Sequence, residues 1–168
     1  MFNRVYFVLV MAFFLSACSL EPPEGKLQVG TEAPSLRTKF LQDVDGDMSR
    51  LTTYRYPDER MYQYSLDAAL STGKTVLVEF ATPGHCTVCD KQLQMLKAMV
   101  EKYGEEVIFL HMDQYKNPGA FKAYDVKGDP WTFVINKQGV VHFKRAGRML
   151  YAEMDKAIEL TIASGERI

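Results

Sequence analysis

The residues of this sequence best suited to chemistry are two cysteines, Cys86 and Cys89, which are separated by two residues. They follow an apolar, β-branched run over 75–81 and open a stretch whose apolar residues recur every three or four positions. This pattern predicts a buried strand and then a helix, with both sulfurs on the first helical turn and near enough to bridge. Unpaired N–H groups and the dipole at a helix N-terminus stabilise a thiolate. We therefore expect Cys86 to have a lowered pKa and to attack, and Cys89 to be the resolving sulfur.

Two other roles for the pair are compatible with this spacing: a structural disulfide, or half of a metal site. A four-ligand zinc site would have to recruit from His85, His111 and His142, because no second cysteine pair exists. Zinc is therefore a poor fit. For that reason we expect no metal site. No glycine-rich phosphate loop follows a strand, so we also expect no organic cofactor.

A small α/β domain must position the pair. Strands are predicted over 75–81, 106–112, 131–135 and 140–144, and helices over 65–71, 89–104, 117–124 and 148–163. This order needs one crossover into a parallel pair and then an antiparallel hairpin, which gives a mixed central sheet flanked by helices. Residues 30–50, with a turn at Asp45-Gly46-Asp47, predict an additional N-terminal β-hairpin, and 54–64 is predicted to be a loop.

Composition limits the possible functions. The chain has 168 residues, 47% of them hydrophobic, which suffices for one core. Its 20 basic and 21 acidic residues give a net charge of −1, so no overall field would attract nucleic acid. Three cysteines are too few for a disulfide-stapled secreted fold.

The N-terminus has the pattern of a targeting signal. Residues 1–17 carry one positive charge, at Arg4, before a short apolar run, as signal peptides do. The sequence Leu15-Ser16-Ala17-Cys18 resembles the bacterial lipobox, in which the cysteine is acylated and becomes the new N-terminus. An uncleaved anchor or an ordinary secretion signal with an incidental Cys18 thiol is the alternative. The lipobox resemblance implies a protein anchored to the lipid bilayer through acylated Cys18, with several acyl chains giving stable attachment.

The segment after the lipobox predicts where the domain sits. Residues 18–29 lack a core pattern and are interpreted as a lipidated N-terminus and tether, leaving 30–168 as the folded domain. Ser19, instead of aspartate, resembles the outer-membrane sorting signal of Gram-negative lipoproteins. We therefore expect the bacterial cell envelope, with the domain in the periplasm and the outer membrane favoured over the inner.

Over about 65–163 the sequence resembles thioredoxin-fold proteins. The resemblance rests on the run VLVEFATPGHCTVCDKQLQML and on residues in the family's order after it: Asp113, Asn117, Pro118, Ala123, Tyr124, Val126, Gly128, Pro130, Phe133, Gly139 and Gly147. Residues 30–34 and 45–47 also look like the start of membrane-tethered periplasmic thioredoxins and of peroxiredoxin relatives. The resemblance implies a thioredoxin fold.

The resemblance also assigns roles near the cysteines. It implies that Pro130 is a cis-proline, which leaves the Asp129 backbone free to pair with an extended substrate; an ordinary trans turn proline is the alternative. It places Glu79 beneath the cysteines, where burial would raise its pKa and let it exchange a proton with the resolving thiol. However, Glu79 precedes Cys86 by seven positions, one more than usual, so a strand-edge glutamate facing water remains open.

Several residues near the pair depart from the family's pattern. His85 replaces the usual tryptophan, and its protonated ring would stabilise the Cys86 thiolate and favour a stronger oxidant. Asp129 would disfavour the thiolate, and Thr87-Val88 replaces the common Gly-Pro without indicating a direction. Trp131 is either a substrate platform or a core residue.

The resemblance implies a thiol–disulfide oxidoreductase outside the cytoplasm. We expect it to reduce protein disulfides, with apocytochrome c or misoxidised proteins as substrates and a membrane thiol transporter as electron donor. A dithiol oxidase or isomerase is the alternative, but oxidases of that compartment usually carry a helical insertion, and only forty residues separate Cys89 from Pro130. Copper handling with His111 or His142 is another alternative; related copper carriers have three residues between their cysteines. The family's peroxidases have a different cysteine motif.

Overall fold

The computed structural model describes residues 26–165. In chain order the elements are η1 (Leu41–Val44), η2 (Met48–Arg50), η3 (Glu59–Tyr62), α1 (Leu66–Ser71), β1 (Thr75–Phe80), α2 (Thr87–Tyr103), β2 (Val107–Met112), α3 (Pro118–Ala123), β3 (Trp131–Ile135), β4 (Val141–Ala146) and α4 (Tyr151–Ser164). The predicted signal peptide 1–17 and Cys18 lie outside the described residues. Within 26–165, no helix has the length and apolar character needed to cross a membrane.

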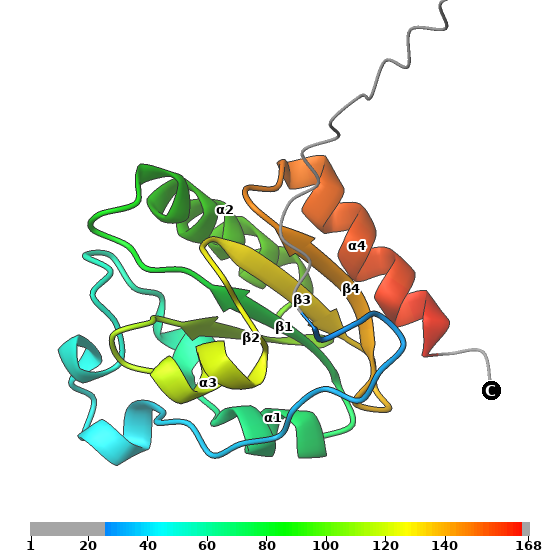
Figure 1. The fold of residues 1–168 in the computed structure, drawn as a ribbon, viewed down its shortest axis with the longest axis horizontal. Coiled ribbons are helices and arrows are strands. Elements are labelled where there is room, and N and C mark those ends of the chain that lie inside the picture. Colours follow the sequence, from blue (N-terminus) through cyan, green and yellow to red (C-terminus); the bar gives the residue numbers. More distant parts are fainter. Residues whose placement is uncertain (1–25, 166–168) are drawn as a thin grey trace, which may run out of the picture.

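The four strands form one mixed sheet in the order β2-β1-β3-β4. β1 runs parallel to β2 and β3 pairs antiparallel with β4, which are the two pairings that the element order predicted. The structure adds that β1 pairs antiparallel with β3. Every residue of β1, β2 and β3 is buried, because the β-branched and apolar runs are covered on both faces. Figure 1 shows α2 and α4 on one side of the sheet and α1 and α3 on the other. The mixed central sheet flanked by helices is thus confirmed.

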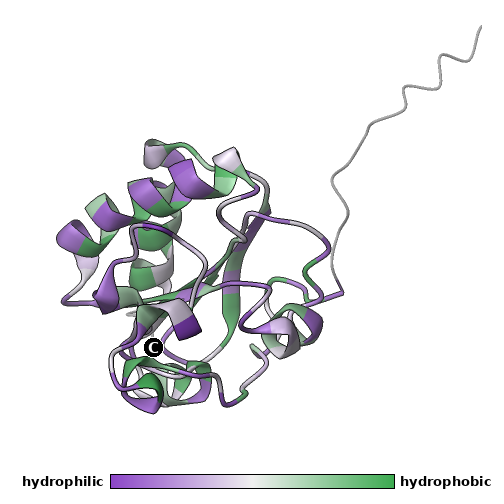
Figure 2. Cartoon of the chain, turned by 90° about the vertical axis from the view of Figure 1, so that its left-hand side faces the viewer, coloured by the Kyte–Doolittle hydropathy of each residue, from purple (hydrophilic) through white to green (hydrophobic). Residues whose placement is uncertain are grey.

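Alternation along β1 divides its side chains between two cores. Leu77 packs in the core under α2 and α4, whereas Val76, Val78 and Phe80 pack in the core facing α1 and α3. Glu79 has the parity of Leu77, so its carboxyl belongs to the face that α2 covers. Figure 2 shows hydrophobic residues along the central strands and hydrophilic ones on the outer turns of the helices.

Helix α2 carries the cysteines at its start. Cys86 is the N-cap residue, with an extended backbone, and its Sγ accepts the Cys89 backbone N–H at 3.1 Å. Buried residues then recur along one side of the helix: Cys89, Gln92, Leu93, Leu96, Met99, Val100 and Tyr103. The sulfurs therefore lie at the start of the amphipathic helix that follows a buried strand, as predicted.

The predicted hairpin over residues 30–50 is wrong. Asp45 and Gly46 do adopt the left-handed turn that the sequence signals, with φ of 53° and 81°. The flanking segments, however, form the short helices η1 and η2 instead of strands, because neither has the alternating apolar pattern that strand pairing needs. The only strand-like pairing in this described segment is an isolated bridge from Glu32 to Val140, beside β4.

The chain contacts the domain from Lys26 onward. The Lys26 backbone N–H donates to Asp125 Oδ2 at 2.7 Å, and Lys144 Nζ donates to the Leu27 carbonyl at 2.9 Å. Gly30 N–H then donates to the Val141 carbonyl at 2.8 Å. Of the predicted tether, residues 26–29 therefore lie against the domain.

Candidate active site

The two cysteines form a disulfide across the first turn of α2. Their Cα atoms are 5.2 Å apart, within the range that a disulfide requires. Cys86 is half-buried and Cys89 is fully buried. Only Cys86 therefore presents its sulfur toward solvent, where the disulfide or thiol of another protein can reach it.

The loop before the pair positions Cys86. Gly84 has a φ of 87°, a conformation that a side chain would strain, and its N–H donates to Asp90 Oδ1 at 3.3 Å. Next to it, His85 is exposed, so the residue that replaces the family's tryptophan stands in solvent beside Cys86.

A cis peptide bond joins Asp129 to Pro130. Strand pairing places this bond near the cysteine loop, because Trp131 lies opposite Phe80, the last residue before that loop. Pro130 is buried and Asp129 is half-buried, with its Oδ2 atom enclosed and lacking a hydrogen-bond partner. The geometry therefore brings Asp129 and Pro130 to the same end of the sheet as the disulfide.

Trp131 is a core residue and not a substrate platform. It is only 4% exposed and packs against Phe133, with ring centroids 6.0 Å apart, on the α1 and α3 side of the sheet. Its parity along β3 turns it away from the cysteine side. Of the two roles that the sequence left open, the structure shows the core one.

Glu79 is fully buried, which excludes the strand-edge position facing water. Its neighbour across the sheet is Thr132, whose hydroxyl donates to Glu79 Oε2 at 2.7 Å. The other carboxyl oxygen, Oε1, is buried without a hydrogen-bond partner. Desolvation raises the pKa of Glu79 to about 8, and the hydrogen bond from Thr132, with the Gln92 amide close by, opposes only part of that rise. The carboxyl can therefore gain or lose a proton near neutral pH.

Gln92 and Thr132 were not predicted as site residues. The Gln92 side chain donates from Nε2 to Thr132 Oγ1 at 3.5 Å and accepts the Met149 backbone N–H at 3.1 Å. Gln92 follows Cys89 by three residues, so the two side chains lie on the same side of α2. This polar chain connects the helix of the cysteines to Glu79. A glutamine inside the apolar stripe of the helix was the signal in the sequence.

A second buried polar cluster supports the cysteine loop. His111 Nε2 donates to the Ala81 carbonyl at 2.9 Å, and Tyr62 donates its hydroxyl to Nδ1 at 2.5 Å. Burial lowers the pKa of His111, which fits a neutral ring used once as donor and once as acceptor. Nearby, the Thr53 backbone and hydroxyl both donate to Asp113 Oδ2 at 2.6 Å. The His111–Ala81 bond joins β2 to the loop before Cys86, and the other bonds join η3 and Thr53 to β2 and to the residue that follows it.

Two of the three histidines considered as metal ligands, His111 and His142, are engaged in other contacts. Both ring nitrogens of His111 are hydrogen-bonded within the protein, and His142 Nδ1 lies 3.0 Å from the Thr161 hydroxyl on α4. In residues 26–165, no three His, Cys, Asp or Glu side chains are grouped so that they could hold a metal ion.

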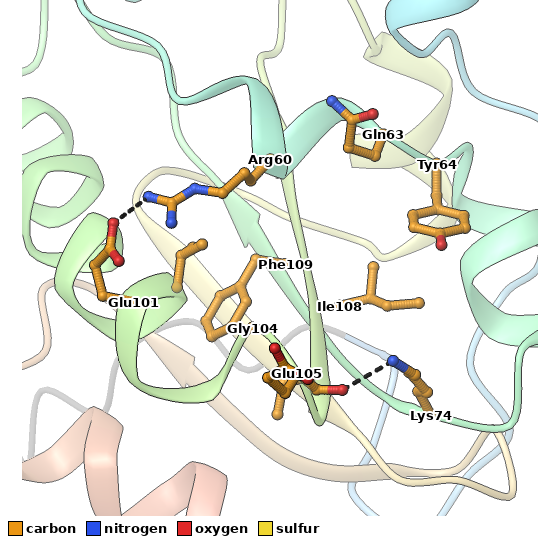
Figure 3. Close-up of a pocket in the computed structure, with 11 residues that line it drawn as sticks. Arg60, Gln63, Tyr64, Lys74, Glu101, Gly104, Glu105, Ile108 and Phe109 are labelled. Atoms are coloured by element: carbon orange, nitrogen blue, oxygen red, sulfur yellow. Dashed lines mark hydrogen bonds and ion pairs between the residues drawn. The ribbon is translucent and has the colours of Figure 1, made fainter.

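A pocket of about 420 Å³ lies at the other end of α2 (Figure 3). Its rim carries the Arg60–Glu101 ion pair at 2.7 Å and a bond from Lys74 Nζ to the Glu105 carbonyl at 2.8 Å. Glu101 follows Cys86 by fifteen residues, which on a helix is about 20 Å. This pocket is therefore not part of the disulfide site.

Comparison with known proteins agrees with this geometry. The family model for thioredoxin matches residues 59–159. Among solved structures, the chain is similar to chloroplastic thioredoxin z, with 20% identity and a TM-score of 0.52, covering 57% of this chain and 85% of that one. It is also similar to oxidized mitochondrial thioredoxin 3 from Saccharomyces cerevisiae, with 20% identity and a TM-score of 0.48, covering 54% and 81%. Curated proteins gave no match. Because the family model spans more than half of the chain, including the cysteine pair, Glu79 and the cis-proline, the chain belongs to the thioredoxin family.

Proposed function

We propose that this protein is an extracytoplasmic thiol–disulfide oxidoreductase that reduces disulfides in other proteins. The observation that carries the proposal is the pair itself: Cys86 is accessible at the N-terminus of α2, and Cys89 is buried one turn further in. That asymmetry suits an attacking and a resolving sulfur. A structural disulfide would not need one sulfur open to solvent.

The reaction proceeds in two exchanges. The Cys86 thiolate attacks one sulfur of the substrate disulfide, forming a mixed disulfide and releasing the other substrate sulfur as a thiolate. Cys89 then loses its proton and attacks Cys86, which forms the Cys86–Cys89 disulfide and releases the second substrate thiol. The protein loses two electrons and the Cys89 proton, and the substrate gains two electrons and two protons, the second of which comes from solvent because Cys86 attacks as a thiolate.

Glu79 is the proposed acceptor of the Cys89 proton. It lies on the sheet face that α2 covers, in a polar chain with Thr132 and Gln92. A carboxyl with a pKa of about 8 is close enough to neutral pH to take up and return a proton during each cycle.

The size of the domain supports the reducing direction. Only β2 and α3 lie between α2 and the cis-proline, so the fold has no helical insertion of the kind expected for a periplasmic dithiol oxidase. A reductase outside the cytoplasm needs a source of electrons, and we propose a membrane protein that passes them to the Cys86–Cys89 disulfide.

The reduction potential of the pair tests this direction. Equilibration with thiol buffers, followed by alkylation of free thiols, should give a value of about −250 mV or lower. A value above about −150 mV would instead identify an oxidase or isomerase. If the full-length protein does not exchange its disulfide with the buffer at all, the oxidoreductase proposal is wrong.

We also propose that the protein is anchored to the bacterial envelope through acylated Cys18, with its domain in the periplasm. This rests on the lipobox-like sequence 15–18 alone. A Cys18→Ser variant expressed in a Gram-negative host should lose incorporation of labelled palmitate and keep residues 1–17, because cleavage before the cysteine follows its acylation. The wild type should remain with the membranes, outer more than inner. Equal labelling of both proteins would exclude Cys18 as the acylated residue.

A further inference from the structure

A groove of about 680 Å³ adjoins the disulfide on the outer side of α2. One wall comes from α2 and the loop before it, and the other comes from the segment that follows η2. The lining residues are Thr53, Tyr54, Arg55, Tyr56, Gly84, Thr87, Asp90, Lys91, Gln94 and Lys97. Gly84 and Thr87 stand two residues before and one residue after Cys86. A polypeptide lying in the groove therefore passes beside the attacking sulfur.

The second wall is a feature of this chain beyond the matched family region. Residues 53–56 precede residue 59, where the match to the thioredoxin model begins. Hydrogen bonds hold this segment in place, because the Thr53 hydroxyl contacts both Asp113 Oδ2 at 2.6 Å and the Pro83 carbonyl at 3.3 Å. In Figure 1 this segment and the loop before α2 lie at the same end of the sheet. The wall is thus fixed to the cysteine loop.

The groove is positively charged and aromatic. Arg55, Lys91 and Lys97 line it against a single carboxylate, Asp90, which already accepts the Gly84 N–H. None of the three cations forms an ion pair within residues 26–165. The Arg55 guanidinium lies 5.6 Å from the centre of the Tyr56 ring, which is 61% exposed. Lys97 Nζ lies 5.9 Å from the centre of the Tyr54 ring. Cations that stand beside aromatic rings and have no carboxylate partner suit a ligand with carboxylates and apolar surface.

We propose that this groove binds an acidic, extended segment of the substrate next to its disulfide, and so selects which disulfides reach Cys86. The inference rests on the proposed function and adds a substrate class to it. Carboxylates on the segment meet Arg55, Lys91 and Lys97, and the backbone lies along Tyr54 and Tyr56. Opposite charge across the groove speeds the encounter and aligns the substrate disulfide with the attacking sulfur.

The test compares two synthetic cystine peptides that differ only in three residues beside the disulfide, which are glutamate in one and lysine in the other. Full-length protein in mild detergent is first reduced, freed of reductant and mixed with excess peptide. Acid quenching and alkylation then give the second-order rate of peptide reduction. At low salt, the acidic peptide should react about tenfold faster than the basic one. Raising the ionic strength from about 20 to about 300 mM should remove most of this preference.

Reversing the charge of the groove should abolish the preference. In R55E/K91E both changes are at exposed side chains, so the fold should tolerate them. The matched control, K122E/K156E, makes the same change in net charge at exposed positions on α3 and α4 and should keep the preference. The uncharged probe 2-hydroxyethyl disulfide gives the intrinsic exchange rate of each protein, and the preference is the ratio of the two peptide rates within the same protein.

The outcomes separate the groove from the chemistry. If the wild type reduces neither peptides nor 2-hydroxyethyl disulfide, the proposed function itself is wrong. If it reduces both peptides equally, or if R55E/K91E keeps the preference, the groove inference is overturned while the function stands. Equal loss in both charge variants would assign the preference to overall charge. A change in self-association of R55E/K91E without a change in preference would assign the groove to a second copy of the chain. Each of these two results also overturns the inference.

Discussion

Replacing Cys86 with serine is expected to lower the rate of substrate disulfide reduction to the background rate of the buffer. The reason is that Cys86 is the half-buried sulfur at the N-terminus of α2, whereas Cys89 is completely enclosed. A hydroxyl has no accessible anion at neutral pH and does not form disulfides, so the first exchange cannot begin. Reduction of a protein disulfide, followed by alkylation and mass analysis, gives the rate.

The matched variant, Cys89→Ser, should fail at a different step. It keeps the attacking thiol, so it should consume about one substrate disulfide per molecule and stop as a mixed disulfide. A mass increase equal to the bound substrate, reversed by added thiol, would demonstrate this. If Cys89→Ser turned over normally, or if Cys86→Ser formed the mixed disulfide instead, the assignment of attacking and resolving sulfurs would be wrong.

Replacing Glu79 with glutamine is the second change from which we expect a large effect. Glutamine preserves the size of the side chain and a hydrogen-bond acceptor for Thr132, but it cannot accept the Cys89 proton. The release of substrate from the mixed disulfide should therefore slow by about a hundredfold, the lower part of the range for general acid–base catalysis. In the wild type the rate of this step should rise with pH and level off above the Glu79 pKa of about 8. The pH profile of the Glu79→Gln variant should lack this transition.

The same variant makes a separate prediction about stability. Folding raises the pKa of Glu79 from its ordinary 4.5 to about 8. Between these values the folded protein holds a proton that the unfolded chain has released, so the free energy of unfolding falls as pH rises and then levels above 8. At about 1.4 kcal/mol per pH unit, the free energy of unfolding should fall by at most about 5 kcal/mol between the two pKa values. Glu79→Gln should remove this part of the pH dependence.

Urea denaturation of the oxidised proteins at about pH 5, 7 and 9 measures this effect. Glu106→Gln is the control, since Glu106 is exposed and should change neither the stability profile nor the exchange rate. A Glu79→Gln protein whose free energy of unfolding keeps the wild-type slope with pH would show that Glu79 ionises normally. A normal slope of the exchange rate with pH would show that another group accepts the proton.

Most elements of the fold could be predicted from local patterns in the sequence. The run TVLVEF is apolar and β-branched enough to specify a strand covered on both faces. The three- and four-residue spacing after Cys86 specifies the amphipathic helix that bears the pair. The same method failed for residues 30–50, because a turn signal alone does not pair two strands. The family resemblance supplied the cis-proline, which no periodicity indicates.

The sequence by itself determined the cysteine pair, the helix that presents it and the order of strands and helices along the chain. Each of these depends on side chains that are close together in the sequence. The tertiary structure decided which side chains meet. Strand register put Thr132 beside Glu79, and burial under α2 settled that this carboxyl faces no water. Trp131 is the residue before Thr132 on β3, and the alternation of side chains along a strand places it in the opposite core. The groove joins residues 53–56 to α2 across about thirty positions of sequence. Contacts across such separations depend on how the whole chain packs, and no local spacing encodes them.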